Sequence, residues 1–382
     1  MREKRNIRLA QPFLSGNEKK YVDECLDTTW ISSIGRFVPS FENRFAEFCG
    51  VDHAVACNTG TAALHLALLG LGVGPGDEVI VPTLTFVATA NAVRYCGGTP
   101  VFVDSEPVTM NLDPERIEAR ISARTKGIVA VHLYGHPADM DPILAIARRR
   151  GLFVLEDAAE AHGATYRGRR TGGLGDAATF SFFGNKIITT GEGGMVTTNS
   201  AALAARIRLL RGQGMDPSRR YWFDVIGYNY RMTNIEAAIG LAQVEQLDLH
   251  VAARRQVADW YSRYLAGCSG FVRLPLQQPF ATHAYWMYTI LLDEAVRMDR
   301  DAFTDALSDL GVETRPVFYP MHVLPPYEEP VADYPVADAL ARRGVSLPTH
   351  ASLTEEDIRY VTGCIERICV LGTQAHAVGN LG

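Results

Sequence analysis

The segment FSFFGNKIITTGEGGMV, residues 180–196, places one lysine, Lys186, between an apolar strand-like run and a glycine-rich turn. A lysine held against an apolar wall has a lowered pKa, and its neutral amine can act as a nucleophile. The other lysines lie in the charged N-terminal region or just before a strand-like run: Lys4, Lys19, Lys20 and Lys126. We therefore expect Lys186 to carry any covalent lysine chemistry. The alternative is a lysine with a buried stem and an ammonium group in solvent.

The turn CNTGTAAL, residues 57–64, joins a strand-like run to a helix-like run. The free N–H groups and the positive dipole end at such a helix start form a binding site for an anion such as phosphate. Gly60 lets the backbone approach the anion closely, and Thr61 adds a hydroxyl group. The alternative is an ordinary strand-to-helix turn with a threonine cap.

Two carboxylates, Asp157 and Glu160, end or follow an apolar run within LFVLEDAAEAHGA, residues 152–164. A carboxylate at the end of a buried strand lies where ligands bind in open α/β sheets, and it can keep a ring nitrogen protonated. The alternative for Asp157 is a helix N-cap. The nearby His162 is a candidate substrate contact, with a half-buried core histidine as the alternative.

Aromatic, hydroxyl and basic residues complete the candidate set. Phe86 follows a strand-like run and can stack on a flat ring, although core packing is the alternative. Arg219 and Arg315 lie in aromatic loops that suit phosphate or carboxylate binding, with ordinary surface arginines as the alternative. Ser181 places a hydroxyl group next to a strand. A phosphate site, a stacking ring, an aspartate, a hydroxyl and a buried lysine are together what pyridoxal phosphate requires.

Apolar strand-like runs alternate with helix-like stretches between residues 53 and 199. The runs cover residues 53–58, 77–86, 99–104, 127–133, 152–158, 176–183 and 193–199. Near-continuous apolar strands separated by helices predict an α/β fold with a mostly parallel sheet covered on both faces.

The rest of the chain indicates a second domain. Residues 215–233 are aromatic, polar and aperiodic, which is typical of a long functional loop. A helical pattern over residues 234–267, with an expected break near LDLH, links to strand-like and helical segments beyond residue 284. We predict a large domain over residues 1–248, a smaller C-terminal domain over residues 249–370 and a flexible tail over residues 371–382.

Composition excludes several classes of protein. The 382 residues are 47% hydrophobic and 21% charged, as in ordinary globular proteins. A formal net charge of -6 argues against a nucleic-acid partner. The N-terminal sequence has no signal-peptide core, and no run of about 18 apolar residues predicts a membrane span. The 7 scattered cysteines lack zinc spacing, so we expect reduced thiols in a cytoplasmic protein and no metal site.

The order and wording of five segments resemble the DegT/DnrJ/EryC1/StrS family of sugar aminotransferases: ACNTGTAALHLAL, DEVIVPTLTFVATANAV, LEDAAEAHGATYRG, GDAATFSFFGNKIITTGEGGM and GYNYRMTNIEAAIGLAQ. The resemblance extends over residues 8–370. It implies a pyridoxal-phosphate enzyme with the aspartate-aminotransferase fold, called fold type I. That fold has a large domain with a mostly parallel seven-stranded sheet and a smaller C-terminal α+β domain.

The resemblance also implies roles for individual residues. Lys186 forms the covalent link to the cofactor, Asp157 pairs with the pyridine nitrogen and Phe86 stacks on the ring. Gly60, Thr61 and Ser181 hold the phosphate, and Asn229 of a second subunit completes that site, so we expect a homodimer.

Glu160 stands where many family members have glutamine, near the phenolic oxygen of the cofactor. Glu160 is then protonated, or that oxygen shares a proton, or Glu160 contacts the substrate instead. A related branch of the family has histidine in place of the lysine and performs dehydration, and Lys186 argues against that branch.

The reaction implied by the resemblance moves an amino group from L-glutamate to a nucleotide-linked 4-keto-6-deoxy sugar. Arg219 and Arg315 are the candidates for the substrate diphosphate. A nicotinamide-dependent oxidoreductase would need a glycine fingerprint after the first strand, which is absent. A pyridoxal-phosphate sensor without turnover stays an alternative, because a fold does not determine a function.

Overall fold

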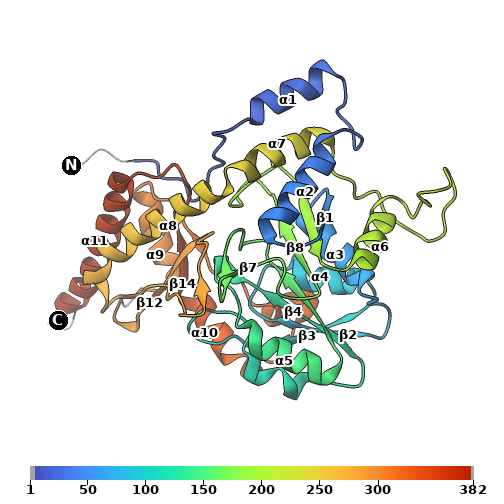
Figure 1. The fold of residues 1–382 in the computed structure, drawn as a ribbon. Coiled ribbons are helices and arrows are strands. Elements are labelled where there is room, and N and C mark those ends of the chain that lie inside the picture. Colours follow the sequence, from blue (N-terminus) through green and yellow to red (C-terminus); the bar gives the residue numbers. More distant parts are fainter. Residues whose placement is uncertain (1–4, 297, 380–382) are drawn as a thin grey trace.

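The computed structural model describes residues 5–296 and 298–379, and its centre is a seven-stranded sheet. The strands are β1 (His53–Cys57), β2 (Glu78–Pro82), β3 (Thr99–Val103), β4 (Thr125–Val131), β5 (Phe153–Asp157), β8 (Ala177–Ser181) and β9 (Gly194–Thr198). Their order is β1-β9-β8-β5-β4-β2-β3, and only β9 runs antiparallel to its neighbours. The expected mostly parallel sheet is confirmed (Figure 1).

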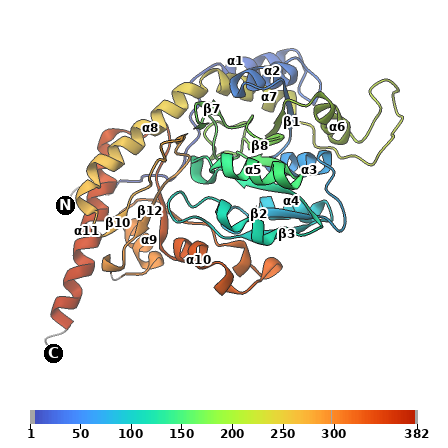
Figure 2. The ribbon, with the colours of Figure 1, turned by 60° about the horizontal axis from the view of Figure 1, so that its bottom comes forward.

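Helices cover both faces of this sheet, because its strands carry apolar side chains on both sides (Figure 2). The core of one face joins Val79 and Val129 to α3 (Gly60–Gly70) and α4 (Ala88–Tyr95). The opposite core joins Ile80 and Ile128 to α5 (Met140–Arg150). Helices α1 (Glu18–Asp27) and α2 (Phe37–Cys49) pack against α7 (Asn234–Glu245).

A smaller antiparallel sheet, with the order β10-β12-β14-β13, forms the C-terminal part of the structure. Its strands are β10 (Val272–Arg273), β12 (Tyr288–Leu292), β14 (Gly344–Leu347) and β13 (Arg315–Pro316). Helices α8 (Leu247–Tyr264), α9 (Arg300–Asp309) and α11 (Glu355–Gly379) contribute to its core, and α10 (Pro335–Arg343) lies next to β12. The large α/β part and smaller α+β part match the expected fold class.

The long helical pattern breaks at Gln246, one residue before the LDLH segment, where the break was expected. Other details of the links between the two parts differ from the sequence expectation. Ile7 pairs with Val312 and lies in the core of the C-terminal part. Helix α11 continues to Gly379, so the segment expected to be a flexible tail has helical backbone up to that residue. The limits of the domains stay a prediction, and residues 380–382 lie outside the described residues.

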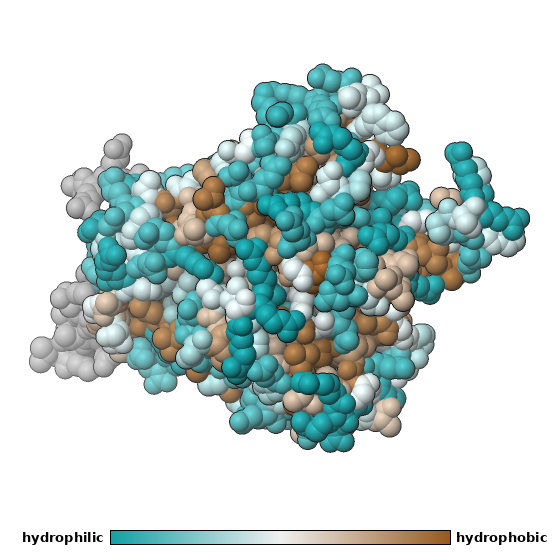
Figure 3. Space-filling model, in the orientation of Figure 1, coloured by the Kyte–Doolittle hydropathy of each residue, from teal (hydrophilic) through white to brown (hydrophobic). Residues whose placement is uncertain are grey.

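A small third sheet and a long arm complete the fold. The strands β11 (Ala281–Thr282), β6 (Thr165–Tyr166) and β7 (Arg169–Arg170) pair antiparallel. Between α6 (Ala201–Arg211) and α7, residues 212–233 form an arm that projects from the body in Figures 1 and 2. Tyr221, Trp222 and Phe223 of this arm are exposed, and Figure 3 shows apolar surface at its base.

In the described part of the chain, no helix combines the length and the apolar character that a membrane crossing requires. All 7 cysteines are buried free thiols.

Candidate active site

A cavity of about 570 Å³ lies at the carboxyl ends of β4, β5 and β8. The last residues of these strands, Val131, Asp157 and Ser181, line it. Parallel sheets bind ligands at this edge, and the volume suits a small molecule. The cavity brings together most residues predicted from the sequence: Gly60, Thr61, Phe86, Asp157, Glu160, Ser181, Lys186 and Arg315.

Lys186 follows β8 in the turn that leads to β9, and its side chain is 12% exposed. Its Nζ atom lies 4.0 Å from the centroid of the Trp286 ring, whose face attracts a cation. The Trp286 indole donates a hydrogen bond of 2.8 Å to the Asn185 carbonyl oxygen, which fixes the ring beside the lysine. Burial lowers the pKa of Lys186, although the carboxylates of Glu160 and Asp157 oppose this change. The amine is therefore shielded from solvent and easier to deprotonate than a surface lysine.

Asp157 ends β5 and is buried at the bottom of the cavity. Its Oδ2 accepts a hydrogen bond of 2.7 Å from the Thr89 hydroxyl, and its Oδ1 accepts one of 3.2 Å from the Ala159 N–H. Burial raises the pKa of Asp157, while these hydrogen bonds and the charge of Lys186 oppose the rise. A buried carboxylate of this kind gains stability when a cationic N–H group comes next to it.

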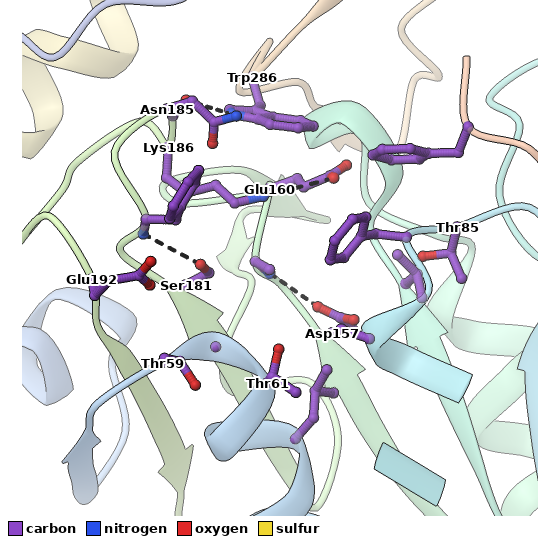
Figure 4. Close-up of a pocket in the computed structure, with 18 of the residues that line it drawn as sticks. Thr59, Thr61, Thr85, Asp157, Glu160, Ser181, Asn185, Lys186, Glu192 and Trp286 are labelled. Atoms are coloured by element: carbon purple, nitrogen blue, oxygen red, sulfur yellow. Dashed lines mark hydrogen bonds and ion pairs between the residues drawn. The ribbon is translucent and has the colours of Figure 1, made fainter. Parts of the chain in front are cut away.

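Glu160 faces Lys186 across the cavity and is 5% exposed (Figure 4). Its Oε1 lies 3.8 Å from Lys186 Nζ, and its Oε2 accepts a hydrogen bond of 2.7 Å from the Tyr134 N–H. Burial raises the pKa of Glu160 to about 7.

The start of α3, where the sequence predicts an anion site, lines the cavity. The Thr59 hydroxyl caps the helix by accepting from the Ala62 N–H at 3.0 Å, and the first N–H groups of a helix have no partner within it. Gly60 packs so closely on β8 that a Cβ atom there would lie 2.7 Å from the Cβ of Ser181. Only glycine fits this close approach, which leaves the Thr61 and Ser181 hydroxyls beside the free helix end.

The wall above these groups is aromatic and basic. Phe86 is 54% exposed and lies 5.7 Å, between ring centroids, from Phe318. Arg315 comes from β13 of the C-terminal sheet, so both parts of the fold contribute to the cavity. An exposed ring and an exposed guanidinium in one cavity can bind a flat or anionic ligand.

Three predicted residues lie outside this cavity. His162 is fully buried among Phe45, Phe180 and Phe182, which makes it a core residue and corrects the expectation of a substrate contact. Arg219 lies on the arm with its guanidinium carbon 4.0 Å from the centroid of the Trp222 ring. Asn229 is exposed at the base of the arm, where it pairs with Gly212. The role of Asn229 in a partner's site stays a prediction.

Several cavity residues were not expected from the sequence: Thr59, Thr85, Asn185, Glu192, Trp286 and Phe318. Thr59 and Asn185 are direct neighbours of predicted residues, so proximity along the chain was a usable signal. Trp286 and Phe318 come from the C-terminal part, more than 90 residues away, and no local pattern pointed to them.

The chain belongs to the DegT/DnrJ/EryC1/StrS aminotransferase family, whose sequence pattern matches residues 12–366. It is 59% identical to the GDP-perosamine synthase of Caulobacter vibrioides over 365 residues, covering 95% of this chain and 98% of that protein. It is 50% identical to the GDP-perosamine synthase of Escherichia coli O157:H7, covering 93% of this chain and 96% of that protein.

Solved structures agree with this assignment. The aminotransferase TlmJ from Streptoalloteichus hindustanus has a TM-score of 0.90 at 33% identity, covering 96% of this chain and 99% of that one. DesI, solved in the presence of its TDP-sugar product, has a TM-score of 0.91 at 34% identity, covering 99% of this chain and 96% of that one. The chain is therefore an aminotransferase of fold type I that depends on pyridoxal phosphate.

Proposed function

We propose that this enzyme transfers an amino group from L-glutamate to C4 of GDP-4-keto-6-deoxy-D-mannose and so makes GDP-perosamine. Two relatives that share 59% and 50% of their residues with the chain over nearly its whole length are named GDP-perosamine synthase. The observation that carries the proposed chemistry is the arrangement of Lys186 and Asp157 in one cavity.

The residues of the cavity fit pyridoxal phosphate. The close approach of Gly60 to Ser181 leaves the free start of α3 beside two hydroxyl groups, which suits the phosphate. Asp157 suits the protonated pyridine nitrogen, because a cation there stabilises its buried carboxylate. Phe86 offers an exposed ring for stacking. When bound, the cofactor carries the amino group between the two substrates and accepts electrons from the bond that is broken.

Lys186 performs the proton transfers. Its buried amine would hold the cofactor covalently, and as a free amine it would remove a proton from the donor carbon and later return one. The aromatic wall formed by Trp286 and Phe318 excludes water from the amine. Both half-reactions, with the amino donor and with the keto sugar, therefore take place beside the Nζ atom of Lys186.

Both substrates use the same cavity in turn, which predicts ping-pong kinetics. Arg315 is the candidate for the donor carboxylate and for the substrate diphosphate, because an exposed guanidinium can bind either anion. Arg219 lies on the arm and would reach a cavity only in an assembly. We infer a cytoplasmic homodimer in which Asn229 of each arm completes the phosphate site of the partner.

The test is a two-step assay on the purified protein, which we expect to be yellow. Incubation with L-glutamate bleaches the visible absorbance, and a chase with GDP-4-keto-6-deoxy-D-mannose restores it and yields GDP-perosamine by mass spectrometry. Lys186→Ala removes both steps, while Lys126→Ala, at an exposed site on β4, keeps them. Turnover by Lys186→Ala at the wild-type rate would disprove the proposal.

A sister activity is the second candidate. A relative with 41% identity is named for a UDP-linked 3-aminotransferase reaction, and DesI was solved with a TDP-sugar product. Running the chase with dTDP- and UDP-linked 4-keto sugars separates these activities from the GDP activity. Bleaching without restoration by any keto sugar would instead indicate a sensor.

A further inference from the structure

Glu160 is an ionisable cavity residue that has no task in the proton transfers described above. It follows β5 by three residues, is 5% exposed and points into the cavity beside Lys186 (Figure 4). Buried glutamates are rare unless they are paired, so its position needs an explanation.

One oxygen of Glu160 is held by the backbone. Its Oε2 accepts from the Tyr134 N–H at 2.7 Å, and Tyr134 has a φ of 54°, a strained value for a bulky residue. Tyr134 is kept in place by stacking on Trp286 and Phe318, with centroid distances of 6.2 and 5.5 Å. Its hydroxyl also accepts from the Phe318 N–H at 3.1 Å. Such strain persists only where the surroundings determine it, so the carboxylate of Glu160 has a fixed orientation.

The second oxygen faces the catalytic amine. Glu160 Oε1 lies 3.8 Å from Lys186 Nζ, a separation at which opposite charges strongly affect each other's protonation. Burial is the main cause that lowers the pKa of Lys186, and the charge of Glu160 is the largest influence that raises it. Burial raises the pKa of Glu160 to about 7, and the charge of Lys186 opposes that rise.

Other charged and titratable groups face this pair from the surrounding elements. Those that line the cavity are Asp157 on β5, Glu192 before β9 and Arg315 on β13. Those packed behind it are Tyr134, His162 and Arg254, the last through its contact with the Lys186 carbonyl oxygen. Asp157 raises the pKa of Lys186 and Arg315 lowers it, both less than Glu160 does. Glu160 is thus the dominant local partner of the amine.

We propose that the fixed carboxylate of Glu160 is the ion-pair partner of the Lys186 amine and stabilises its protonated form. The 3.8 Å between Oε1 and Nζ is longer than a hydrogen bond, so Glu160 acts on the amine through its charge. Glu160 acts through Lys186, so it is a positioning residue for the amine.

This inference rests on the proposed function, in which Lys186 both removes and returns a proton. A buried lysine with a low pKa is readily available as a neutral base, but only a small fraction of it stays protonated to return the proton. A carboxylate that stabilises the ammonium form of Lys186 corrects this imbalance.

The test compares the wild-type protein with Glu160→Gln, which keeps the shape and an oxygen that can accept from Tyr134. The first measurement is the pH midpoint of the visible absorbance change of the bound cofactor, which reports protonation of the Lys186 nitrogen. The second is the pH dependence of labelling of Lys186 by an amine reagent in the cofactor-free full chain, followed by mass spectrometry. We expect Glu160→Gln to lower both midpoints by about one pH unit or more.

Glu192→Gln is the matched control, because it removes the same charge from an exposed position on the same cavity. We expect its midpoints to lie within about 0.3 pH unit of the wild type, since solvent screens an exposed charge. Unchanged or raised midpoints in Glu160→Gln, with an unaltered melting temperature, would overturn the inference. If the enzyme acts on a sugar linked to another nucleotide, the midpoint shift in Glu160→Gln is still observed. If instead Glu160 does not act on Lys186, the midpoints do not shift, but the wild-type protein still converts the GDP sugar.

Discussion

Gly60 and Ser181 approach each other so closely that a Cβ atom on Gly60 would lie 2.7 Å from the Cβ of Ser181. The first residue of α3 and the last residue of β8 are thus in direct contact at the base of the cavity. In the proposed function this contact connects the packing of the sheet to the binding of phosphate, because the same glycine begins the helix that is proposed to bind that group.

Replacing Gly60 by alanine tests this connection. The added methyl group forces α3 and β8 apart, which we expect to lower the free energy of unfolding by about 1–3 kcal/mol. The displaced helix start also weakens binding of pyridoxal phosphate, measured by titration of the cofactor-free protein. Gly74→Ala is the control, because a Cβ at Gly74 has no neighbour within 4 Å. Wild-type cofactor affinity in Gly60→Ala would refute the close contact.

Arg254 on α8 holds the catalytic segment to the C-terminal part of the fold. Its guanidinium is buried and donates to the carbonyl oxygens of Trp286, Thr349 and Lys186, at 3.1, 2.5 and 3.4 Å. No carboxylate lies within 4.0 Å of it in the part of the chain that the structure describes, and burial lowers the pKa of Arg254 to about 10. A buried cation without a carboxylate partner depends on these carbonyl contacts.

We therefore expect Arg254→Lys to be damaging although it keeps the charge. A single ammonium group cannot reach all three carbonyl oxygens, so buried acceptors lose partners at a cost of about 1–3 kcal/mol in unfolding free energy. The value of kcat also falls, because Lys186 and Trp286 lose a common anchor. Chemical denaturation and steady-state kinetics measure the two effects. Arg263→Lys, at an exposed position on the same helix, serves as the control and changes neither.

The sheet and the base of the cavity were predictable because the information is local. Apolar runs mark buried strands, and polar residues that end them, such as Asp157 and Ser181, fall at the ligand-binding edge by the geometry of parallel strands. Lys186 was identified because few lysines exist in the chain and only one lies between apolar and glycine-rich segments.

The aromatic wall formed by Trp286 and Phe318 was not predictable, because it depends on contacts between segments that are distant in the sequence. Trp286 lies beside Lys186 because the C-terminal part of the fold packs against the large part, and no spacing in the sequence encodes that contact. His162 shows the opposite error. Its position two residues after Glu160 suggested a ligand contact, but the backbone directs its side chain into the core, between aromatic rings. Sequence position alone does not tell which way a side chain faces in an irregular segment.

His162 also predicts how stability depends on pH. Burial lowers the pKa of His162 from 6.5 to about 3. Between these two pH values the unfolded chain binds a proton at the imidazole and the folded chain does not. The free energy of unfolding is therefore not reduced by this group above pH 6.5, and it falls as the pH decreases below that value. A difference of one bound proton between the unfolded and folded chain changes the unfolding free energy by about 1.4 kcal/mol per pH unit in that range.

We expect His162→Leu to lose less stability than the wild type between pH 7 and pH 5, measured by urea unfolding. Leucine suits the aromatic surroundings, and kcat/KM at pH 7 stays near the wild-type value because His162 does not line the cavity. His53→Gln, at a half-exposed position on β1, serves as the control for removing an imidazole outside the aromatic core. A large loss of kcat/KM in a stable His162→Leu protein would restore His162 as a substrate contact.

The arm carries the most direct test of a shared active site. Asn229 is exposed and outside the cavity of its own chain, while its arm projects from the body with exposed aromatic side chains. If the Asn229 side chain serves the cavity of a second copy, each cavity takes Lys186 from one subunit and Asn229 from the other. A hybrid of the two variants then contains one cavity with both residues intact and one with neither.

Co-expression of the two variants with different tags, followed by purification on both tags, isolates this hybrid. At a cofactor concentration that half-saturates the wild type, we expect Lys186→Ala alone to be inactive and Asn229→Ala alone to be impaired. The hybrid regains about half of the wild-type activity, because one of two cavities in a twofold assembly is complete. A hybrid of Lys186→Ala with Lys186→Arg stays inactive and controls for the tags. Recovery of no hybrid would disprove the dimer, and a hybrid no more active than half of Asn229→Ala would place Asn229 outside the partner's site.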